Sequence, residues 1–435
     1  MRVYFISLLA ILSFSLKGQE KINLNDAKKM LLENNIQLKQ SELKEKISKI
    51  NHDIAQYDIT PTINFNVNNQ QTMGLVFDQV SGKLITGNQW TNYANATISS
   101  TVVLYAGNSK INSIRNEKIN HDISVLQTIK LKRDLVIEMV GLFFQTLINR
   151  DLYNASNEQL KFSTNQVIQL TEEVEIGRRT LGDIAQANSK KATDKLNNIT
   201  SKNAYESSLL KLKQILDIPL EKDIEITAPN NYLSIGTTEY LLRDQDDPDL
   251  RILNKKLELS EIQIKLEKSK YLPSISFNTG YGTNFSSQRY LQNTNYIMPL
   301  LDQLNQNRSF YGIISLSFPI YNGFKTKSNI KKAKLDKQIL SYDKIAVDNE
   351  RIKVFSDAVL EYRAAREELI AVNALVEANK VNFEALNIRY QVGKSSSAEL
   401  FKSLTDLNIS EFTQISTRYK LMFRHEILKL LTNNK

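Results

Sequence analysis

Two patterns of apolar and polar positions alternate along the chain. In residues 108–216 and 322–431 apolar side chains recur every three or four positions, which is typical of amphipathic helices. In residues 60–67 and 274–285 apolar and polar side chains alternate one by one, which is typical of β-strands with two different faces. The chain is therefore predicted to be mainly α-helical with a small β part.

The predicted helices are unusually long. They cover about 108–176, 183–216, 322–392 and 398–431, and none of these ranges contains a proline. At a rise of 1.5 Å per residue, the first and third helices would each be roughly 100 Å long, far beyond an ordinary globular helix. Such lengths indicate a coiled coil or a barrel of helices.

The alternating segments place apolar residues on one side and amide or hydroxyl residues on the other. Ile63, Phe65 and Val67 alternate with one polar set, and Ile275 and Phe277 alternate with a second. The two polar sets are Asn64, Asn66 and Asn68, and Ser274, Ser276 and Asn278. The apolar side suits either a protein core or lipid, and the polar side suits a water-filled lumen.

Each alternating segment is expected to form a hairpin with a second strand. The partner strands are predicted at about 93–105 and 310–321, with long loops at about 73–92 and 286–309. We expect these four strands to be the only β-structure in the chain.

The order of elements occurs twice, with Gly177 and Gly393, as well as Pro61 and Pro273, at matched places. Each copy contains a helix, a strand hairpin, a long helix, a turn and a second long helix. We expect a first structural repeat over 19–216 (hairpin about 60–105, helical hairpin about 108–216), an equatorial connection over 217–247, and a second repeat over 248–431 (hairpin about 273–321, helical hairpin about 322–431).

The N-terminal segment indicates export. Residues 1–18 combine a basic residue, Arg2, with an apolar run of 14 residues, and this pattern predicts a signal peptide cleaved near Gly18–Gln19. An uncleaved anchor is the alternative, although the run is short for a span of about 20 residues. The chain has no cysteine, which excludes disulfides, thiolate metal sites and a lipoprotein anchor. The exported protein is expected to be periplasmic, secreted or an outer-membrane β-barrel.

The remaining composition disfavours enzymatic and nucleic-acid functions. The formal net charge is +9, but the lysines are interspersed with glutamate and asparagine along helices, which is typical of a solvated face. His52, His121 and His425 are isolated and lack metal-ligand spacing. No nucleophile, nucleotide or dinucleotide motif is present in the sequence. We therefore expect no enzymatic activity, no cofactor, no metal site and no nucleic-acid partner.

Closure of the strands requires more than one chain. Eight strands are the usual minimum for a transmembrane barrel, and an open sheet edge is not tolerated in hydrocarbon. Three chains with four strands each would supply twelve strands. The alternative is a soluble periplasmic coiled-coil scaffold or adaptor without a pore, which explains the long helices but not the two alternating hairpins.

A short motif at the predicted helix reversals points to a family. It contains Tyr390, Gly393, Ser396, Glu399 and Leu400 in the second repeat. The first repeat has Val174, Gly177, Thr180, Asp183 and Ile184 at the matched positions. With this motif and the duplicated order of elements, the chain resembles TolC-like outer-membrane efflux proteins. The resemblance covers nearly the whole mature chain, 19–431.

The resemblance implies an architecture and partners. It implies a homotrimer in the outer membrane of a Gram-negative-type envelope, with a 12-stranded β-barrel in the lipid and a 12-helix α-barrel in the periplasm. It also implies a passive exit duct of a tripartite efflux or secretion system, gated at the periplasmic helical tips. The implied partners are a periplasmic adaptor (membrane fusion) protein and an inner-membrane transporter. The exported substrate is left open.

The resemblance also implies residue roles. Gly177 and Gly393 would allow each long helix to reverse, and Thr180, Tyr390 and Ser396 would belong to the tip turns that contact the adaptor. Asp183 and Glu399 are either caps of the returning helices or carboxylates that line the periplasmic aperture. Lys402 stands where the family has an acidic residue, so it either pairs with Glu399 of a neighbour or faces outward. The polar strand residues, Asn64, Asn66, Asn68, Ser274, Ser276 and Asn278, would line the barrel lumen.

Overall fold

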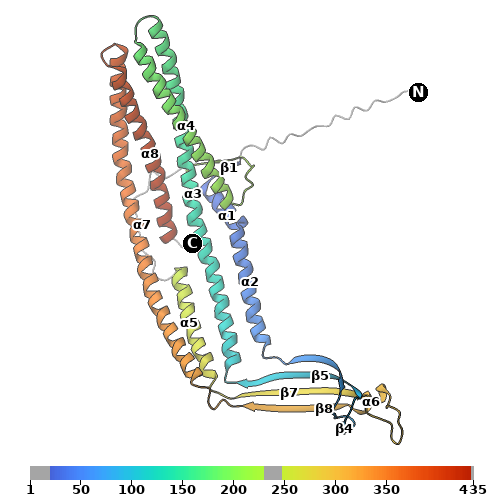
Figure 1. Ribbon diagram of the computed structural model, residues 1–435. Coiled ribbons are helices and arrows are strands. Elements are labelled where there is room, and N and C mark those ends of the chain that lie inside the picture. Colours follow the sequence, from blue (N-terminus) through green and yellow to red (C-terminus); the bar gives the residue numbers. More distant parts are fainter. Residues whose placement is uncertain (1–19, 230–246, 433–435) are drawn as a thin grey trace, which may run out of the picture. The chain divides into compact units, whose positions relative to one another are not determined.

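The computed structural model describes residues 20–229 and 247–432 and is mainly helical (Figure 1). The predicted signal peptide and part of the predicted connection lie outside these residues. In chain order the elements are β1 (Glu20–Ile22), α1 (Leu24–Asn34), α2 (Ile36–Tyr57), β2 (Thr62–Met73), β3 (Val76–Asp78), β4 (Lys83–Ile85), β5 (Trp90–Ala106), α3 (Ser109–Glu175), α4 (Leu181–Ile215), β6 (Ile224–Ile226), α5 (Pro248–Ser269), β7 (Ser274–Ser286), α6 (Leu300–Gln306), β8 (Ser309–Ser317), α7 (Lys325–Gln391) and α8 (Ser397–Thr432).

The long helices occur where the sequence predicts them. Helices α3 and α7 contain 67 residues each, and α4 and α8 contain 35 and 36. No helix in the described part of the chain is both long enough and apolar enough to cross a membrane. The predicted four long helices are therefore confirmed within a few residues at each end.

The chain divides into two compact units, each discontinuous in sequence. One unit, called here the core unit, contains the described residues of 1–42, 128–248 and 347–435. The other, called here the sheet unit, contains residues 43–127 and 249–346. Each unit takes segments from both halves of the chain, so the units do not coincide with the predicted repeats.

The sheet unit contains an open antiparallel sheet in the order β2–β5–β7–β8. Its first and last strands, β2 and β8, each have one side without a partner strand in the sheet. The two hairpins predicted from the sequence are β2 with β5 and β7 with β8. They join through β5 and β7, which pair over almost their full length with one bulge at Leu104.

The register separates apolar from polar side chains. Opposed residues Phe65, Ile98, Tyr281 and Phe310 lie on one face of the sheet, because directly paired residues in antiparallel strands point to the same side. All six predicted polar positions lie on the opposite face by the same register. None of the residues of β2, β5, β7 and β8 is charged. The sheet therefore has one apolar face and one neutral polar face.

The helices of the sheet unit follow the same order as the strands. Ser48 of α2 hydrogen-bonds His121 of α3, with 3.0 Å between Oγ and Nδ1. Lys255 of α5 forms an ion pair with Asp122 of α3 at 3.3 Å. Lys337 of α7 donates to Glu261 of α5 at 2.8 Å, and this contact lowers the pKa of Glu261. Helices α2 and α7 thus flank the row, as β2 and β8 flank the sheet.

Some strand predictions require correction. Strand β8 ends at Ser317, not at about 321, because Pro319 lacks a backbone N–H and cannot continue a ladder. The four strands are not the only β-structure, because β3 and β4 form a small hairpin and β1 pairs in parallel with β6. The loop predicted at 286–309 also contains the short helix α6. These elements are too short to give a periodic signal.

A large apolar cluster lies in the core unit. Helices α1, α3, α4 and α8 and strands β1 and β6 all contribute to it. Leu31, Met139, Phe143 and Leu212 are fully buried within it. Burying a side chain of this size contributes roughly 1.5–3 kcal/mol, so this cluster is the main apolar core of the core unit.

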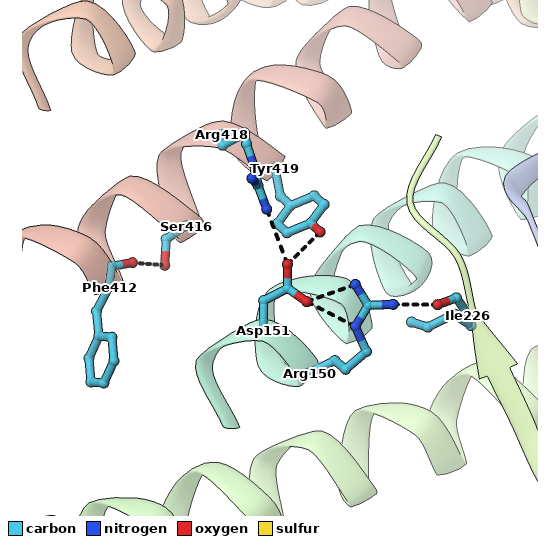
Figure 2. Close-up of polar contacts among 7 residues, drawn as sticks. All are labelled: Arg150, Asp151, Ile226, Phe412, Ser416, Arg418 and Tyr419. Atoms are coloured by element: carbon cyan, nitrogen blue, oxygen red, sulfur yellow. Dashed lines mark hydrogen bonds and ion pairs between the residues drawn. The ribbon is translucent and has the colours of Figure 1, made fainter. Parts of the chain in front are cut away.

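A polar network links three elements beside this cluster (Figure 2). Asp151 of α3 accepts hydrogen bonds from Tyr419 Oη at 2.7 Å and from Arg418 Nη2 at 3.1 Å, both on α8. It also accepts from Arg150 Nε and Nη2 at 2.9 and 2.7 Å. Arg150 in turn donates to the carbonyl oxygen of Ile226 in β6. Burial, followed by the contact with Asp151, raises the pKa of Tyr419.

Candidate functional site: the helical tips and the polar sheet face

The reversal from α3 to α4 is a glycine-terminated helix end. Gly177 has φ +71°, in the left-handed region that favours glycine. Its N–H donates to the carbonyl of Val174 at 2.9 Å, and the N–H of Arg178 donates to the carbonyl of Glu173 at 2.8 Å. This pair of bonds is the Schellman arrangement, which satisfies carbonyls at the helix end.

The reversal from α7 to α8 has the same geometry. Gly393 has φ +74°, and its N–H donates to the carbonyl of Tyr390 at 3.0 Å. The N–H of Lys394 donates to the carbonyl of Arg389 at 2.8 Å. An added Cβ at Gly177 or Gly393 would meet no atom within 4 Å. Backbone conformation rather than space therefore accounts for glycine at both reversals.

Each returning helix begins with a capping box. Asp183 accepts from the backbone N–H of Thr180 at 3.0 Å and from its hydroxyl at 2.8 Å. Thr180 Oγ1 accepts from the Asp183 N–H at 3.3 Å. Glu399 likewise accepts from the Ser396 N–H at 3.1 Å, and Ser396 Oγ accepts from the Glu399 N–H at 3.3 Å. The predicted capping geometry is therefore present at both reversals.

These contacts favour the ionised form of both carboxyl groups. The Ser397 hydroxyl, followed by the N–H and hydroxyl of Thr180, lowers the pKa of Asp183. Ser397 also lies 2.7 Å from Gln186 Oε1, so its single proton serves only one acceptor at a time. The Ser395 hydroxyl and the Ser396 N–H lower the pKa of Glu399, which is fully exposed. Both carboxylates are therefore charged at neutral pH.

One arginine joins the two tips, and the sequence motif did not reveal it. Arg179 Nη2 donates to the Tyr390 carbonyl at 2.8 Å, and its guanidinium carbon lies 3.9 Å from the centroid of the Tyr390 ring. Arg179 Nε also donates to Glu173 at 3.0 Å. Tyr390 is buried, and burial raises its pKa. Because position 179 lies 211 residues from Tyr390 in sequence, only the fold identifies this contact.

Lys402 is exposed on α8, while its neighbour Phe401 is buried. The position matched in the first repeat is Gln186, which is partly exposed and contacts Ser397. Apolar residues beneath the tips, including Leu170, Ala187 and Leu400, form a second buried cluster. The structure thus joins the two tips at two places, through Arg179 with Tyr390 and through Ser397 with Gln186.

The predicted lumen residues lie together on the polar sheet face. Asn64, Asn66 and Asn68 are exposed on β2, and the three predicted residues of β7 are partly exposed. Thr101 of β5 donates to Asn278 Oδ1 of β7 at 2.6 Å on this face. Sequence reasoning missed Tyr311, whose ring occupies the space beside Gly280 on this face and would collide with a Cβ there at 2.6 Å.

Comparison with known proteins identifies the family. Residues 243–432 match the model of the family described as outer membrane efflux protein. The second half of the chain therefore matches this family, as the resemblance to TolC-like outer-membrane efflux proteins leads us to expect. The chain is 19% identical over 301 residues to outer membrane protein TolC of Escherichia coli K12, and 18% identical over 307 residues to that of Salmonella enteritidis. The matches cover 68% of this chain but only 61% and 60% of those relatives.

Solved structures of outer-membrane channels share the fold. The Campylobacter jejuni CmeC outer membrane channel has a TM-score of 0.80 at 15% identity, covering 94% of this chain and 85% of CmeC. CusC has a TM-score of 0.78 at 14% identity, covering 95% and 92% of the two chains. The open state of the Neisseria gonorrhoeae MtrE outer membrane channel has a TM-score of 0.74 at 15% identity, covering 94% and 89%. These likenesses confirm the expected fold class, and the family match over 243–432 agrees with the expected resemblance.

Proposed function

We propose that the protein is the passive outer-membrane exit duct of a tripartite efflux or secretion system. The observation that carries this proposal is the two-faced sheet with two unpaired edges, β2 and β8. An apolar face suits lipid, and a neutral polar face suits a water-filled lumen. The edges can be satisfied within hydrocarbon only by other strands. A soluble coiled-coil scaffold would have no use for such a sheet.

Three copies close this sheet into a barrel of twelve strands. Pairing of β2 in one copy with β8 in the next leaves no open edge. The helices α2, α3, α5 and α7 follow the strand order, so α2 of one copy would likewise meet α7 of the next. Helix α2 carries an exposed apolar stripe, Leu43, Ile47, Ile50, Ile54 and Tyr57, at the three- and four-residue spacing of a helical seam. Helix α7 carries Leu335, Ile339 and Tyr342 at the same spacing, also more than half exposed.

The two halves of the chain are structural repeats in this proposal, and the tips form the periplasmic gate. Asp183 and Glu399 of three copies would line the aperture, with Lys402 at or near its rim. The turns containing Gly177, Thr180, Tyr390, Gly393 and Ser396 would contact a periplasmic adaptor. No nucleotide motif is present in the sequence, so an inner-membrane transporter would supply the energy. The neutral strands would impose little charge selection on the exported molecule.

The opposite faces of β2 provide the test. Phe65 and Asn66 are adjacent and both exposed, but they point to opposite sides of the sheet. Phe65→Lys would place a charge in lipid at a cost of about 2–4 kcal/mol, and assembly in the outer membrane should fall sharply. Asn66→Lys should assemble normally and shift the ion selectivity of the channel toward anions in planar bilayers.

Native mass in detergent gives the accompanying readout. The wild-type chain and Asn66→Lys should behave as particles of three chains recovered from the outer-membrane fraction. Equal behaviour of the two variants, or a wild-type monomer in the soluble periplasmic fraction, would overturn the proposed duct.

A further inference from the structure

The loops at one end of the four-stranded sheet form a small folded cap. Strands β3 and β4 and helix α6 lie at the same end of the sheet (Figure 1). The Ser286 hydroxyl donates to Asp78 Oδ2, which links β7 to the β3–β4 hairpin across 208 residues of sequence. Gln303 of α6 accepts from the Ser286 N–H at 2.9 Å and donates to the Ser286 carbonyl at 3.0 Å. Asp78, Ser286 and Gln303 are all buried, so the cap is a specific structure.

The cap presents large apolar side chains outward on both of its sides. Phe77 and Leu84 are directly paired across the β3–β4 hairpin, whereas Asp78 and Ile85 of the same hairpin are buried. On the other side, α6 buries Gln303 and exposes Leu301. The at least half-exposed apolar residues of the cap include Leu75, Phe77 and Leu84 on the hairpin side and Tyr296, Leu300 and Leu301 on the α6 side. This exposure is unusual beside a buried polar network.

Each of the two apolar groups adjoins an edge strand of the sheet in the chain, and both are anchored at the end of β7 through Ser286. The β3–β4 hairpin follows edge strand β2 after two residues, since β2 ends at Met73 and β3 begins at Val76. Helix α6 ends at Gln306, just before edge strand β8 begins at Ser309. When β2 of one copy pairs antiparallel with β8 of the next, the end of β2 lies beside the start of β8. The hairpin of one copy then lies beside α6 of its neighbour.

We infer that the cap is an inter-subunit clasp. Phe77 and Leu84 of one copy dock against Leu300 and Leu301 of the next. The partner that covers each apolar group is therefore a second copy of this chain. This inference rests on the proposed function, because it requires that the sheet edges pair between copies. It adds a contact outside the barrel strands, one that continues the strand interface into the loops and shields apolar side chains that the single chain leaves exposed.

The absence of cysteine from the chain makes a cross-linking test specific. A tagged chain carrying Phe77→Cys and an untagged chain carrying Leu301→Cys are co-expressed and oxidised in intact outer membranes. A covalent dimer of one tagged and one untagged chain is expected on non-reducing gels, and neither variant expressed alone should form it. The matched control replaces Phe77→Cys with Ile63→Cys, an exposed position at the opposite end of β2, and should give no dimer.

Substitution provides a second readout. Phe77→Ser together with Leu301→Ser should lower the temperature at which the trimer dissociates in SDS, whereas Lys83→Ser in the same hairpin should leave it unchanged. The clasp would be overturned, and the duct left intact, by the following combination of results. The trimer has its normal mass, no cross-link forms, and the double substitution leaves the dissociation temperature unchanged. If the Phe77→Cys thiol reacts with a membrane-permeant maleimide but not with an impermeant one, this surface faces lipid. That result would also overturn the clasp. A single-chain mass would overturn both proposals.

Discussion

At the scale of single residues, Asp151 connects several side chains of the core unit. It is 19% exposed and binds Arg150, Arg418 and Tyr419, which lie on α3 and α8. Its partner Arg150 also binds the backbone of β6. One carboxylate therefore joins two helices and, through Arg150, the short strand pair.

Asp151→Ala should destabilise the core unit. The substitution leaves a half-buried arginine and the Tyr419 hydroxyl without their shared acceptor, at a cost of about 2–3 kcal/mol. The change is measured as a lower midpoint of denaturant unfolding, followed by helical circular dichroism in detergent. The control is Glu158→Ala, which removes an exposed ion pair with Lys161 and should change the free energy by less than about 1 kcal/mol. Equal midpoints for the two variants would contradict the role of Asp151.

At the scale of elements, the two helical hairpins end in turns with the same design. A left-handed glycine ends the outgoing helix, and a capping box begins the returning one. The carboxylates Asp183 and Glu399 therefore have a structural role whether or not they also line an aperture. These two roles predict different effects on backbone order and on conductance.

Protonating these carboxylates should loosen the tips. The folded-state pKa of each group lies below its unfolded value, so the unfolded tip binds protons more readily. The stabilisation is complete above about pH 4.5 and is lost as the pH falls through the folded-state pKa values. Hydrogen exchange of amides in 178–186 and 394–402 should therefore lose protection on acidification, with no matching loss in the apolar cluster of the core unit.

Asp183→Asn with Glu399→Gln separates capping from gating. Amides retain a hydrogen-bond acceptor but not the charge, so the turns should keep most of their structure at neutral pH. If the carboxylates line the aperture, the double variant should pass more current than the wild type in planar bilayers. Unchanged conductance would restrict both residues to capping. Glu158→Gln, an exposed carboxylate on α3 outside the tip turns, is the matched control.

At the scale of the whole molecule, the surfaces without a partner lie on the first and last elements of the sheet unit. These are β2 and α2 at one end and β8 and α7 at the other. Strands β2 and β8 have open edges, and the flanking helices α2 and α7 have exposed apolar stripes. A heterologous contact between such ends generates a closed ring when the rotation between copies is exact. The same chain therefore carries both halves of the interface that its proposed trimer requires.

Ile50→Asp should weaken this assembly. The substitution places a charge in the middle of the α2 stripe, where desolvation on packing against a neighbour opposes association. Native mass in detergent should shift from three chains toward one. Asn51→Asp adds the same charge at the adjacent exposed position and should leave the trimer intact. Retention of the trimer by both variants would show that the stripe lies outside the interface.

The sequence by itself determined the local structure. Three- and four-residue periodicity located α3, α4, α7 and α8, and alternation located the strands and separated their two faces. The glycines and the acidic residues six positions later identified both tip turns and their caps. All of these features depend on interactions within a few residues, because helix ladders, pleats and caps are local. Periodicity therefore reports them directly.

Only the tertiary structure decided which distant segments meet. The pairing of β5 with β7, the contact of Arg179 with Tyr390, and the link from Asp78 to Ser286 join positions far apart in the chain. Each depends on side-chain shape and hydrogen-bond geometry after folding, and none leaves a periodic trace. The short elements β1, β3, β4, β6 and α6 escaped prediction for the same reason. β1 and β6 depend on each other for backbone pairing, and the β3–β4 hairpin and α6 are anchored by side-chain bonds to Ser286 of β7.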